Sequence, residues 1–260
     1  MIPKSVLVVC YKDTFGTENV VRKALHRSGI AHSCINRDEL SAGRLKKAGL
    51  IITVGGDGTF LRTARYVGRQ PVLSVAANLR ENEGFFARAS KTDFERKLGL
   101  LLKGRHKVVS LSRLESTIRV KGGISRPELA VNEVYIGSAK PYLTARYVLK
   151  IGGRQEFQKS SGVLVSTAAG STGWIGSAGG KRIPIHDKRM QYLVREPFFG
   201  RLTRPRLLQG MLPPDASLKI KSLNWNGIVV VDSHHHEHQF KEGAEITVRR
   251  AKVPLRLITF

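Results

Sequence analysis

With 260 residues, of which 41% are hydrophobic and 7% aromatic, the chain can bury a sizeable core, which excludes a disordered polypeptide. Its apolar runs are far too short to cross a bilayer, and its start predicts a first strand rather than a signal peptide, so we expect a cytoplasmic protein. The net charge of +24 is spread along the chain and suits nucleotides, polyphosphate or nucleic acid about equally well, so it excludes none of these partners.

Residues 5–90 alternate short apolar runs with stretches of helical periodicity, a pattern typical of strand-helix-strand units. We expect strands near residues 6–9, 32–35, 50–54 and 72–75, and helices over residues 19–27, 38–47, 59–67 and 91–102. Parallel strands with helices outside them would form an α/β domain over residues 1–104.

The third of these strands runs directly into Gly55-Gly56-Asp57-Gly58-Thr59. Glycine lacks a Cβ, so a ligand can approach the main chain closely and use its N–H groups. Because a helix is expected after Thr59, the turn would lie at a helix N-terminus, where free amides and the helix dipole favour a bound phosphate. The alternative is a tight connection without a ligand, since Asp and Gly are both common in turns.

Asp57 is the unusual member of this turn, because a carboxylate repels phosphate unless it has another role. Such a role is to accept a proton from an attacking hydroxyl or to hold a metal ion. The sequence contains neither a Walker-type phosphate loop nor a Gly-x-Gly-x-x-Gly after a strand, so neither of those nucleotide-binding motifs applies.

Beyond residue 105 the periodicity changes to alternation, which predicts a β-rich domain over residues 105–260. Paired glycines at 122–123 and 152–153 indicate hairpins. The apolar runs expected to form strands of this domain are residues 116–121, 129–136, 147–151, 163–166, 218–220, 228–231, 246–249 and 255–258.

Two polar groups stand out in this second half. Residues 161–180 are dense in glycine and hydroxyl side chains, which suit ribose and phosphate oxygens, and Trp174 in the same stretch could stack on a base. A tight loop without a ligand is the alternative. Asn132-Glu133 interrupts an apolar run, where an amide and a carboxylate need polar partners such as a ribose diol or an adenine edge.

The order and spacing of three motifs resemble the NAD kinase family. These motifs are Gly55-Gly56-Asp57-Gly58-Thr59, Asn132-Glu133, and Gly170-Ser171-Thr172 with the following Ser177-Ala178-Gly179-Gly180. The first motif is shared with diacylglycerol and sphingoid lipid kinases and, loosely, with phosphofructokinases, whereas the later two favour NAD kinase. The resemblance covers nearly the whole chain.

This resemblance implies an α/β N-terminal domain, a β-rich C-terminal domain, an active site between them and a homo-oligomer, either a homodimer or a homotetramer. It also implies phosphorylation of the adenosine ribose 2′-hydroxyl of NAD, with ATP or polyphosphate as the donor and Mg²⁺ bridging the donor phosphates. NAD and ATP would thus be the partners, with no membrane and no specific nucleic acid.

Matching positions carry the family's roles onto this sequence. Asp57 would orient and deprotonate the 2′-hydroxyl of NAD. The residues that would meet the phosphoryl donor are Gly55, Gly56, Gly58 and Thr59. The residues that would bind NAD are Asp57, Gly58, Asn132, Glu133, Thr172, Gly173, Trp174 and Ser177, with Trp174 standing where the family commonly has a tyrosine. No residue is assigned to a metal held by the protein.

The sequence departs from the family pattern at three places. Ala168-Ala169 replaces the usual proline and hydroxyl residue, and Ser161 stands before Gly162 where many members have an aspartate that touches the substrate. The loop of residues 78–84 is longer than the common bacterial loop and more like that of mitochondrial-type members. The choice between NAD and NADH therefore stays open.

His234-His235-His236-Glu237-His238 places four imidazoles within five residues, a composition able to bind a transition metal. Family members have a surface hairpin here, after an aspartate that corresponds to Asp232. A solvated loop is therefore favoured over a metal site.

Two other functions remain as alternatives. A lipid or sphingoid kinase would use the same glycine-aspartate turn, but it would need a large apolar acceptor pocket or a membrane-facing surface. A non-catalytic relative that binds polyanions would account for the net charge of +24, but retention of Asp57 argues against it.

Overall fold

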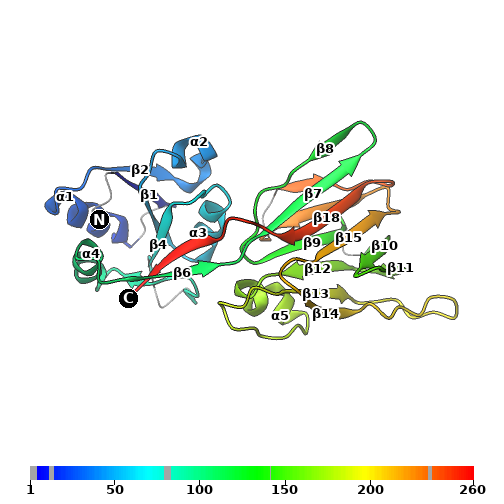
Figure 1. Ribbon diagram of the computed structural model, residues 1–260. Coiled ribbons are helices and arrows are strands. Elements are labelled where there is room, and N and C mark those ends of the chain that lie inside the picture. The colour runs from blue at the N-terminus through cyan, green and yellow to red at the C-terminus, as the bar shows by residue number, and fades with distance from the viewer. Residues whose placement is uncertain (1–4, 12–14, 79–82, 141, 234–235) are drawn as a thin grey trace. The chain divides into compact units, whose positions relative to one another are not determined.

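The computed structural model describes residues 5–11, 15–78, 83–140, 142–233 and 236–260, which form two compact units (Figure 1). The first unit comprises Met1–Leu111 and Val253–Phe260, and the second comprises Ser112–Lys252. These limits differ from the expected division at residue 104, because the chain leaves the first unit later and returns to it at its C-terminal end.

A seven-stranded sheet forms the first unit, in the order β2-β1-β3-β4-β19-β6 with β5 beside β4. All of its pairings are parallel except that of β19 with β6. Each of the four strands expected before residue 76 is confirmed. The strands are β1 (Val6–Cys10), β2 (His32–Asn36), β3 (Leu50–Gly55), β4 (Pro71–Ala76), β5 (Ala89–Ser90), β6 (Lys107–Leu111) and β19 (Leu255–Thr259).

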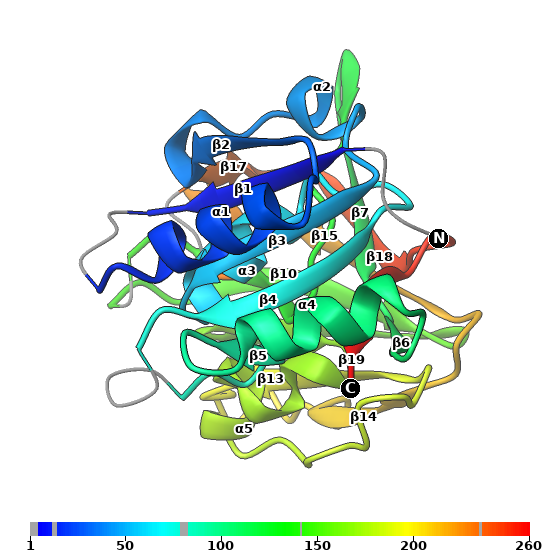
Figure 2. The same cartoon turned by 90° about the vertical axis from the view of Figure 1, so that its left-hand side faces the viewer.

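Helices cover both faces of this sheet. α1 (Thr17–Arg27) and α4 (Phe94–Leu102) lie on one face, and α3 (Asp57–Ala64) lies on the other (Figures 1 and 2). Leu25 of α1 and Leu98 of α4 are buried in one core with alternate residues of β1, β3 and β4, as the two-residue repeat of a strand requires. The expected α/β architecture with a parallel sheet is confirmed.

The expected helix over residues 38–47 is wrong. The structure has a short 3-10 turn, η1 (Arg37–Glu39), followed by a four-residue helix, α2 (Ala42–Leu45). Ser41 is extended, and its hydroxyl accepts the N–H of Arg44 as an N-cap. Because Ser41 caps a helix that begins only at Ala42, the segment is divided, although its helical spacing suggests one continuous helix.

The last strand, β19, belongs to the first sheet, whereas we expected residues 255–258 in the second domain. It pairs with β4 and β6, and it is the red arrow among the strands of the first unit in Figure 1. Its apolar alternation resembles that of the preceding antiparallel strands, and periodicity does not reveal which sheet a strand joins. Both ends of the chain therefore contribute to the sheet that contains β3.

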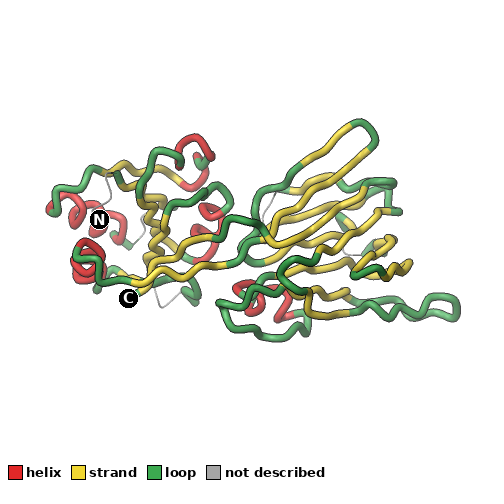
Figure 3. The backbone as a smooth tube through the Cα atoms, viewed as in Figure 1, coloured by secondary structure: helices red, strands yellow, loops and turns green. Residues whose placement is uncertain are grey.

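The second unit consists of two six-stranded antiparallel sheets with little helix (Figure 3). Their orders are β11-β10-β15-β18-β7-β8 and β14-β13-β12-β9-β16-β17. The elements are β7 (Leu114–Val120), β8 (Gly123–Ser125), β9 (Glu133–Ser138), β10 (Ala145–Ile151), β11 (Arg154–Ser160), β12 (Gly162–Ser166), η2 (Ala169–Thr172), α5 (Trp174–Ser177), β13 (Met190–Arg195), β14 (Gln209–Leu212), β15 (Ser217–Ser222), β16 (Gly227–Val231), β17 (Glu237–Gln239) and β18 (Glu245–Arg250).

Both sheets contribute to one core, so the second unit is a sandwich. Leu149 of β10 and Ile246 of β18 are buried with Val163 and Val165 of β12. The expected β-rich character is confirmed, as are the hairpins at the two glycine pairs, which join β7 to β8 and β10 to β11. Among the described residues, no helix is long and apolar enough to span a membrane.

Candidate active site

The glycine turn joins β3 to α3 at the carboxyl end of a strand inside the parallel sheet. Gly55 ends β3, Gly56 is the N-cap of α3, and Asp57 is its first residue. Asp57 is partly exposed and Gly58 is exposed, so a ligand can reach both from solvent. Ligands of open α/β sheets bind beyond the carboxyl ends of the strands, and the first amides of a helix attract anions.

Gly55 and Thr59 are in close contact inside this turn. A Cβ at Gly55 would lie 2.5 Å from Thr59 Oγ1, so only glycine fits there without moving its neighbour. Thr59 is buried, and its hydroxyl accepts a 3.3 Å hydrogen bond from Arg37 Nη1. Thr59 thus packs beneath the turn, and Arg37 adds a positive charge beside it.

Main-chain amides hold both carboxylate oxygens of Asp57. The N–H of Phe85 donates to Oδ2 and that of Phe86 donates to Oδ1, each over 3.0 Å. The buried Phe86 ring stacks on Phe60 of α3 with 4.4 Å between centroids, which fixes the segment that supplies the amides. Gly84 precedes this segment with a φ of +62°, which favours glycine. The carboxylate is therefore fixed in orientation and keeps lone pairs that can accept a proton.

Arg88 is a second basic side chain close to Asp57. Its Nη1 donates to the carbonyls of Phe85 and Ala87, over 2.9 Å and 2.7 Å. Burial lowers the pKa of Arg88, and the negative charge of Asp57 raises it, so the two charges interact. Residues 79–82 of the long loop noted in the sequence lie outside the described residues.

In the second unit, Asp232 organises the backbone of the Asn132-Glu133 pair. Its carboxylate accepts the N–H groups of Val131, Asn132 and Glu133, over 2.9 Å, 2.8 Å and 3.2 Å. Asp232 and Ser233 both have a φ of +50°, a conformation that non-glycine residues rarely adopt, so strain is held at this turn. Glu133 is the first residue of β9 and Asn132 directly precedes it, so the pair lies at the start of the strand instead of inside it.

Glu133 is only 2% exposed, and its Oε1 accepts a 3.1 Å hydrogen bond from Ser233 Oγ. Burial, together with the charge of Asp232, raises the pKa of Glu133 to about 8. At neutral pH the carboxyl therefore keeps its proton. Glu133 Oε2 and Asn132 Oδ1 are buried without a hydrogen-bond partner among the described residues. Unpaired buried polar atoms on adjacent residues are what a bound ligand would satisfy.

The loop after β12 lies against this pair. Thr167 donates its N–H to the carbonyl of Asn132 over 2.9 Å and its hydroxyl to the carbonyl of Val131 over 2.5 Å. Gly173 faces the pair, because a Cβ there would lie 3.3 Å from Glu133 Oε2 and 3.5 Å from Asn132 Nδ2. A side chain at this position would crowd the two polar groups, which glycine avoids.

Thr172 and Ser177, two further predicted contacts, are exposed residues of the same loop. Thr172 ends η2 directly before Gly173, and Ser177 ends α5, where its N–H donates to the carbonyl of Gly173 over 3.2 Å. Among the contacts of the described residues, this hydrogen bond to Gly173 is the only link between Ser177 and the Asn132-Glu133 pair.

Trp174 lines a cavity of about 700 Å³ in the second unit. Its indole lies 5.1 Å from the Tyr135 ring, and the Arg195 guanidinium lies 5.1 Å from the same indole. Ser161 and Ser233 also line the cavity. An aromatic wall beside hydroxyl groups suits a heteroaromatic ring joined to a ribose.

The predicted site residues fall into two groups, one in each unit. The first group is Gly55, Gly56, Asp57, Gly58 and Thr59, and the second is Asn132, Glu133, Thr172, Gly173, Trp174 and Ser177.

Sequence reasoning missed Arg37, Arg88, Tyr135 and Arg195. Two of these had a detectable signal, because Tyr135 follows Glu133 on the same side of β9 and Arg37 directly follows β2 at the edge of the sheet where the glycine turn lies. Arg88 makes its contacts from a loop, and Arg195, the last residue of β13, reaches Trp174 of α5 through tertiary packing, so neither leaves such a local signal.

Both halves of the chain match models of known protein domains. Residues 4–106 match the ATP-NAD kinase N-terminal domain, and residues 131–260 match the ATP-NAD kinase C-terminal domain. The chain is 28% identical to a probable NADH kinase from Oryza sativa subsp. japonica, over 93% of this chain and 80% of that protein. It is 31% identical to an NAD kinase from Tolumonas auensis, over 88% of this chain and 76% of that protein.

Solved structures share the fold. A crystal structure of an NAD kinase from Archaeoglobus fulgidus in complex with ATP aligns with a TM-score of 0.79 and 24% identity, over 97% of this chain and 92% of that one. A crystal structure of yeast NADH kinase complexed with NADH aligns with a TM-score of 0.82 and 18% identity, over 99% of this chain and 83% of that one. The matches to both domains and the identity to curated relatives show that the chain belongs to the NAD kinase family.

Proposed function

We propose that this NAD kinase family member transfers the γ-phosphoryl group of ATP to the 2′-hydroxyl of the adenosine ribose of NAD, which yields NADP and ADP. A bond forms between the ribose oxygen and the γ-phosphorus while the bond to the β,γ-bridging oxygen breaks. The hydroxyl proton passes to Asp57. The observation that carries this assignment is the Asp57 carboxylate at the start of α3, oriented by two main-chain amides.

Asp57 acts as the general base in this proposal. Each of its oxygens accepts one amide N–H, which leaves a lone pair on each oxygen for the substrate hydroxyl. The two amides come from consecutive residues packed through Phe86, so the carboxylate does not need to be ordered when substrate arrives. This arrangement supports proton acceptance at a defined position.

The glycine turn binds the donor phosphates. Gly55, Gly56 and Gly58 bring main-chain amides to the N-terminus of α3, and Arg37 and Arg88 add positive charge. Mg²⁺ would neutralise the donor phosphates. Asp57 fits this ion, because a partly exposed carboxylate is the oxygen ligand that Mg²⁺ takes beside phosphates and waters.

The second unit binds the adenosine half of NAD. Glu133, with its proton retained, donates to an acceptor of the nucleoside, and Asn132 Oδ1 accepts from a donor. Trp174, backed by Tyr135 and Arg195, offers a stacking surface in the same unit. Thr172, Gly173 and Ser177 complete the set that the family resemblance assigns to NAD.

Association of copies and a cytoplasmic location form part of the same proposal. Phe198, Phe199 and Leu202 are large apolar side chains exposed by 52%, 60% and 90%, and such clusters mark association surfaces. They support the homodimer or homotetramer that the resemblance implies. Matches to both NAD kinase domains leave a lipid or sphingoid kinase and a non-catalytic polyanion binder without a favouring observation.

NADP formation by the purified chain tests the proposal. NAD or NADH is supplied as acceptor, ATP or polyphosphate as donor, and Mg²⁺ is present throughout. An NADP-specific dehydrogenase then reports the product without responding to NAD. We expect product with at least one acceptor and donor pair. Absence of NADP and NADPH under all four combinations would contradict the proposal and would direct the search to lipid acceptors.

A further inference from the structure

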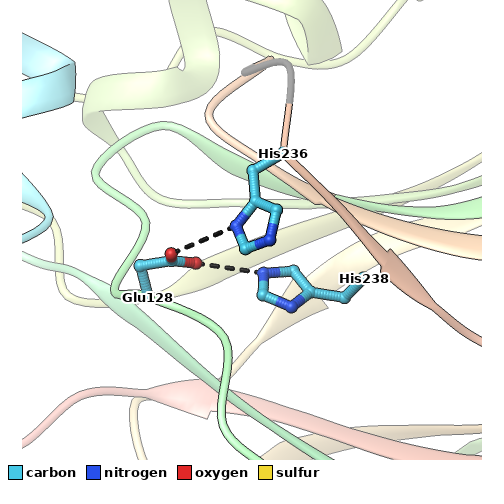
Figure 4. Close-up of side chains that lie close together, drawn as sticks. All are labelled: Glu128, His236 and His238. Carbon is cyan, nitrogen blue, oxygen red and sulfur yellow. Dashed lines mark hydrogen bonds and ion pairs between the residues drawn. The ribbon is translucent and has the colours of Figure 1, made fainter. Parts of the chain in front are cut away.

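Three side chains of metal-ligand type that the kinase reaction does not use meet in the second unit (Figure 4). Glu128 Oε1 lies 3.4 Å from His236 Nδ1, and Glu128 Oε2 lies 3.0 Å from His238 Nε2. Each residue offers a ligand atom, and these atoms lie within 4.8 Å of one another. Both imidazoles approach the same carboxylate from a segment distant in the sequence.

Strand geometry explains why the two imidazoles share one side. His238 lies in β17 and His236 directly precedes it, so the side chains stand two residues apart and project the same way. Their ring centroids are 4.5 Å apart. Glu128 lies in the segment that leads to Val131. The N–H of Val131 donates to the carboxylate of Asp232, which directly follows β16, the strand that pairs with β17. The ligands therefore come from two segments that are already fastened together.

We propose that Glu128, His236 and His238 form a binding site for a divalent first-row transition metal ion, with Zn²⁺ as the representative ion. Ligand bonds of ~2.0–2.1 Å at tetrahedral angles place ligand atoms about 3.3 Å apart. The two distances between carboxylate and imidazole, 3.0 Å and 3.4 Å, bracket this spacing. These two distances involve different oxygens of Glu128, and the three ligand atoms lie within 4.8 Å of one another, so the side chains would draw together by up to about 1.5 Å around a bound ion.

The chemistry of the ligands selects the class of ion. Imidazole nitrogen suits Zn²⁺ and its neighbours in the first transition row, whereas Mg²⁺ and Ca²⁺ take oxygen ligands. Three protein ligands leave a further coordination position for water. The His236 side chain is 60% exposed, so both the ion and water can reach the site.

The proposed metal site lies next to the cavity that Trp174 lines. Ser233, three residues before His236, donates to Glu133, and Ser233 and Glu237 both line the cavity. A bound ion would restrain the turn that carries Ser233 and would thereby alter NAD affinity. This consequence rests on the proposed function, whereas metal binding itself does not.

Titration of the whole chain with Zn²⁺ tests the site. The protein is produced without a histidine tag, stripped with a chelator and titrated calorimetrically, and its zinc content is measured after gel filtration. We expect one tightly held Zn²⁺ per chain and a higher melting temperature with Zn²⁺. Co²⁺ at the same site should give visible absorption that Zn²⁺ displaces.

Variants assign the ligands. Glu128→Gln, His236→Ala and His238→Ala should each weaken Zn²⁺ binding by at least the ~10–100-fold that loss of an outer-shell partner costs. His186→Ala, which changes another exposed histidine of the same unit, should bind like the parent. Circular dichroism without metal checks that each variant folds. If one variant does not fold, the Zn²⁺ affinities of the other two still test the ligand assignment.

Three results would overturn the proposal. The parent chain retains no zinc after gel filtration, or the three ligand variants bind Zn²⁺ as tightly as the parent. The third is that His234→Ala combined with His235→Ala abolishes binding while the Glu128, His236 and His238 variants preserve it. Because none of these readouts uses kinase activity, they are independent of whether the chain phosphorylates NAD.

Discussion

Glu133 shows how one side chain is set by its surroundings. Burial and the nearby charge of Asp232 give it a pKa of about 8 in the folded chain, against an ordinary value of 4.5. Between pH 4.5 and about pH 8, Glu133 releases its proton in the unfolded chain but keeps it in the folded chain. The free energy of unfolding must therefore fall as pH rises through this window and level off above about pH 8.

Glu133→Gln should remove this contribution. Relative to the parent, the variant should gain stability from pH 5 to pH 8, by on the order of a few kcal/mol in total, because glutamine has no proton to lose. Urea unfolding at several pH values measures the difference. A stability difference that stays constant across the window would mean that Glu133 is ionised in the folded chain.

Asp232 is a positioning residue whose carboxylate accepts three amide N–H groups. In Asp232→Asn, an amide group would replace one of the accepting oxygens. We expect a loss of about 1–3 kcal/mol in stability, because buried donors lose their acceptor, and a raised KM for NAD. Chemical unfolding and steady-state kinetics check the two effects. An unchanged KM in a folded variant would show that the Asn132-Glu133 backbone does not depend on Asp232.

At the scale of elements, the β3-α3 junction depends on the contact between Gly55 and Thr59. Gly55→Ala would place a Cβ 2.5 Å from Thr59 Oγ1 and would shift the turn that carries Asp57. A displacement of this kind should lower kcat by about 10- to 100-fold.

Gly99→Ala is the matched control for this change, because nothing lies within 4 Å of a Cβ there and the site is a helix interior. It should leave kcat unchanged and add about 0.5–1 kcal/mol of stability. Equal kinetics for both variants would refute the role assigned to the junction.

The elements that sequence patterns predicted well are those whose signal is local. The apolar run of β3, the following glycines and the helical spacing of α1 and α4 all lie within a dozen residues. The patterns failed where a distant partner decides the outcome, as for β19, which joins the first sheet through β4 and β6. They also failed at Ser41, where a cap divides an apparent helix.

The same limit applies to the site. Asp57, Asn132 and Glu133 stand out because a charged or amide side chain is unusual beside glycine or inside an apolar run. The amides of Phe85 and Phe86 that orient Asp57 could not be predicted, because they reach it through a loop that returns from 28 and 29 positions away in sequence. The contacts of Glu128 with His236 and His238 could not be predicted for the same reason, because the partners lie 108 and 110 positions apart in sequence.

For the whole molecule, the net charge of +24 should raise the local concentration of anionic substrates. We expect kcat/KM for ATP to fall by about tenfold or more between low salt and several hundred millimolar KCl, because salt screens this attraction. The kcat at saturating ATP should change little, and it serves as the internal control. A kcat/KM that is flat with ionic strength would contradict electrostatic attraction of the donor.

Transfer of the phosphoryl group to NAD by the parent and by Asp57→Asn, measured side by side, tests the central claim most directly. Asp215→Asn, which alters a carboxylate with a side chain 98% exposed, is the control. NAD binding, followed by the quenching of tryptophan fluorescence, should be retained in all three proteins, with only a small loss in Asp57→Asn, because an amide oxygen still accepts the hydrogen bond of the ribose hydroxyl. Loss of at least about 100-fold in kcat in Asp57→Asn alone is the expected result for removal of a general base. A kcat equal to that of the parent would contradict the assignment of Asp57 as the proton acceptor.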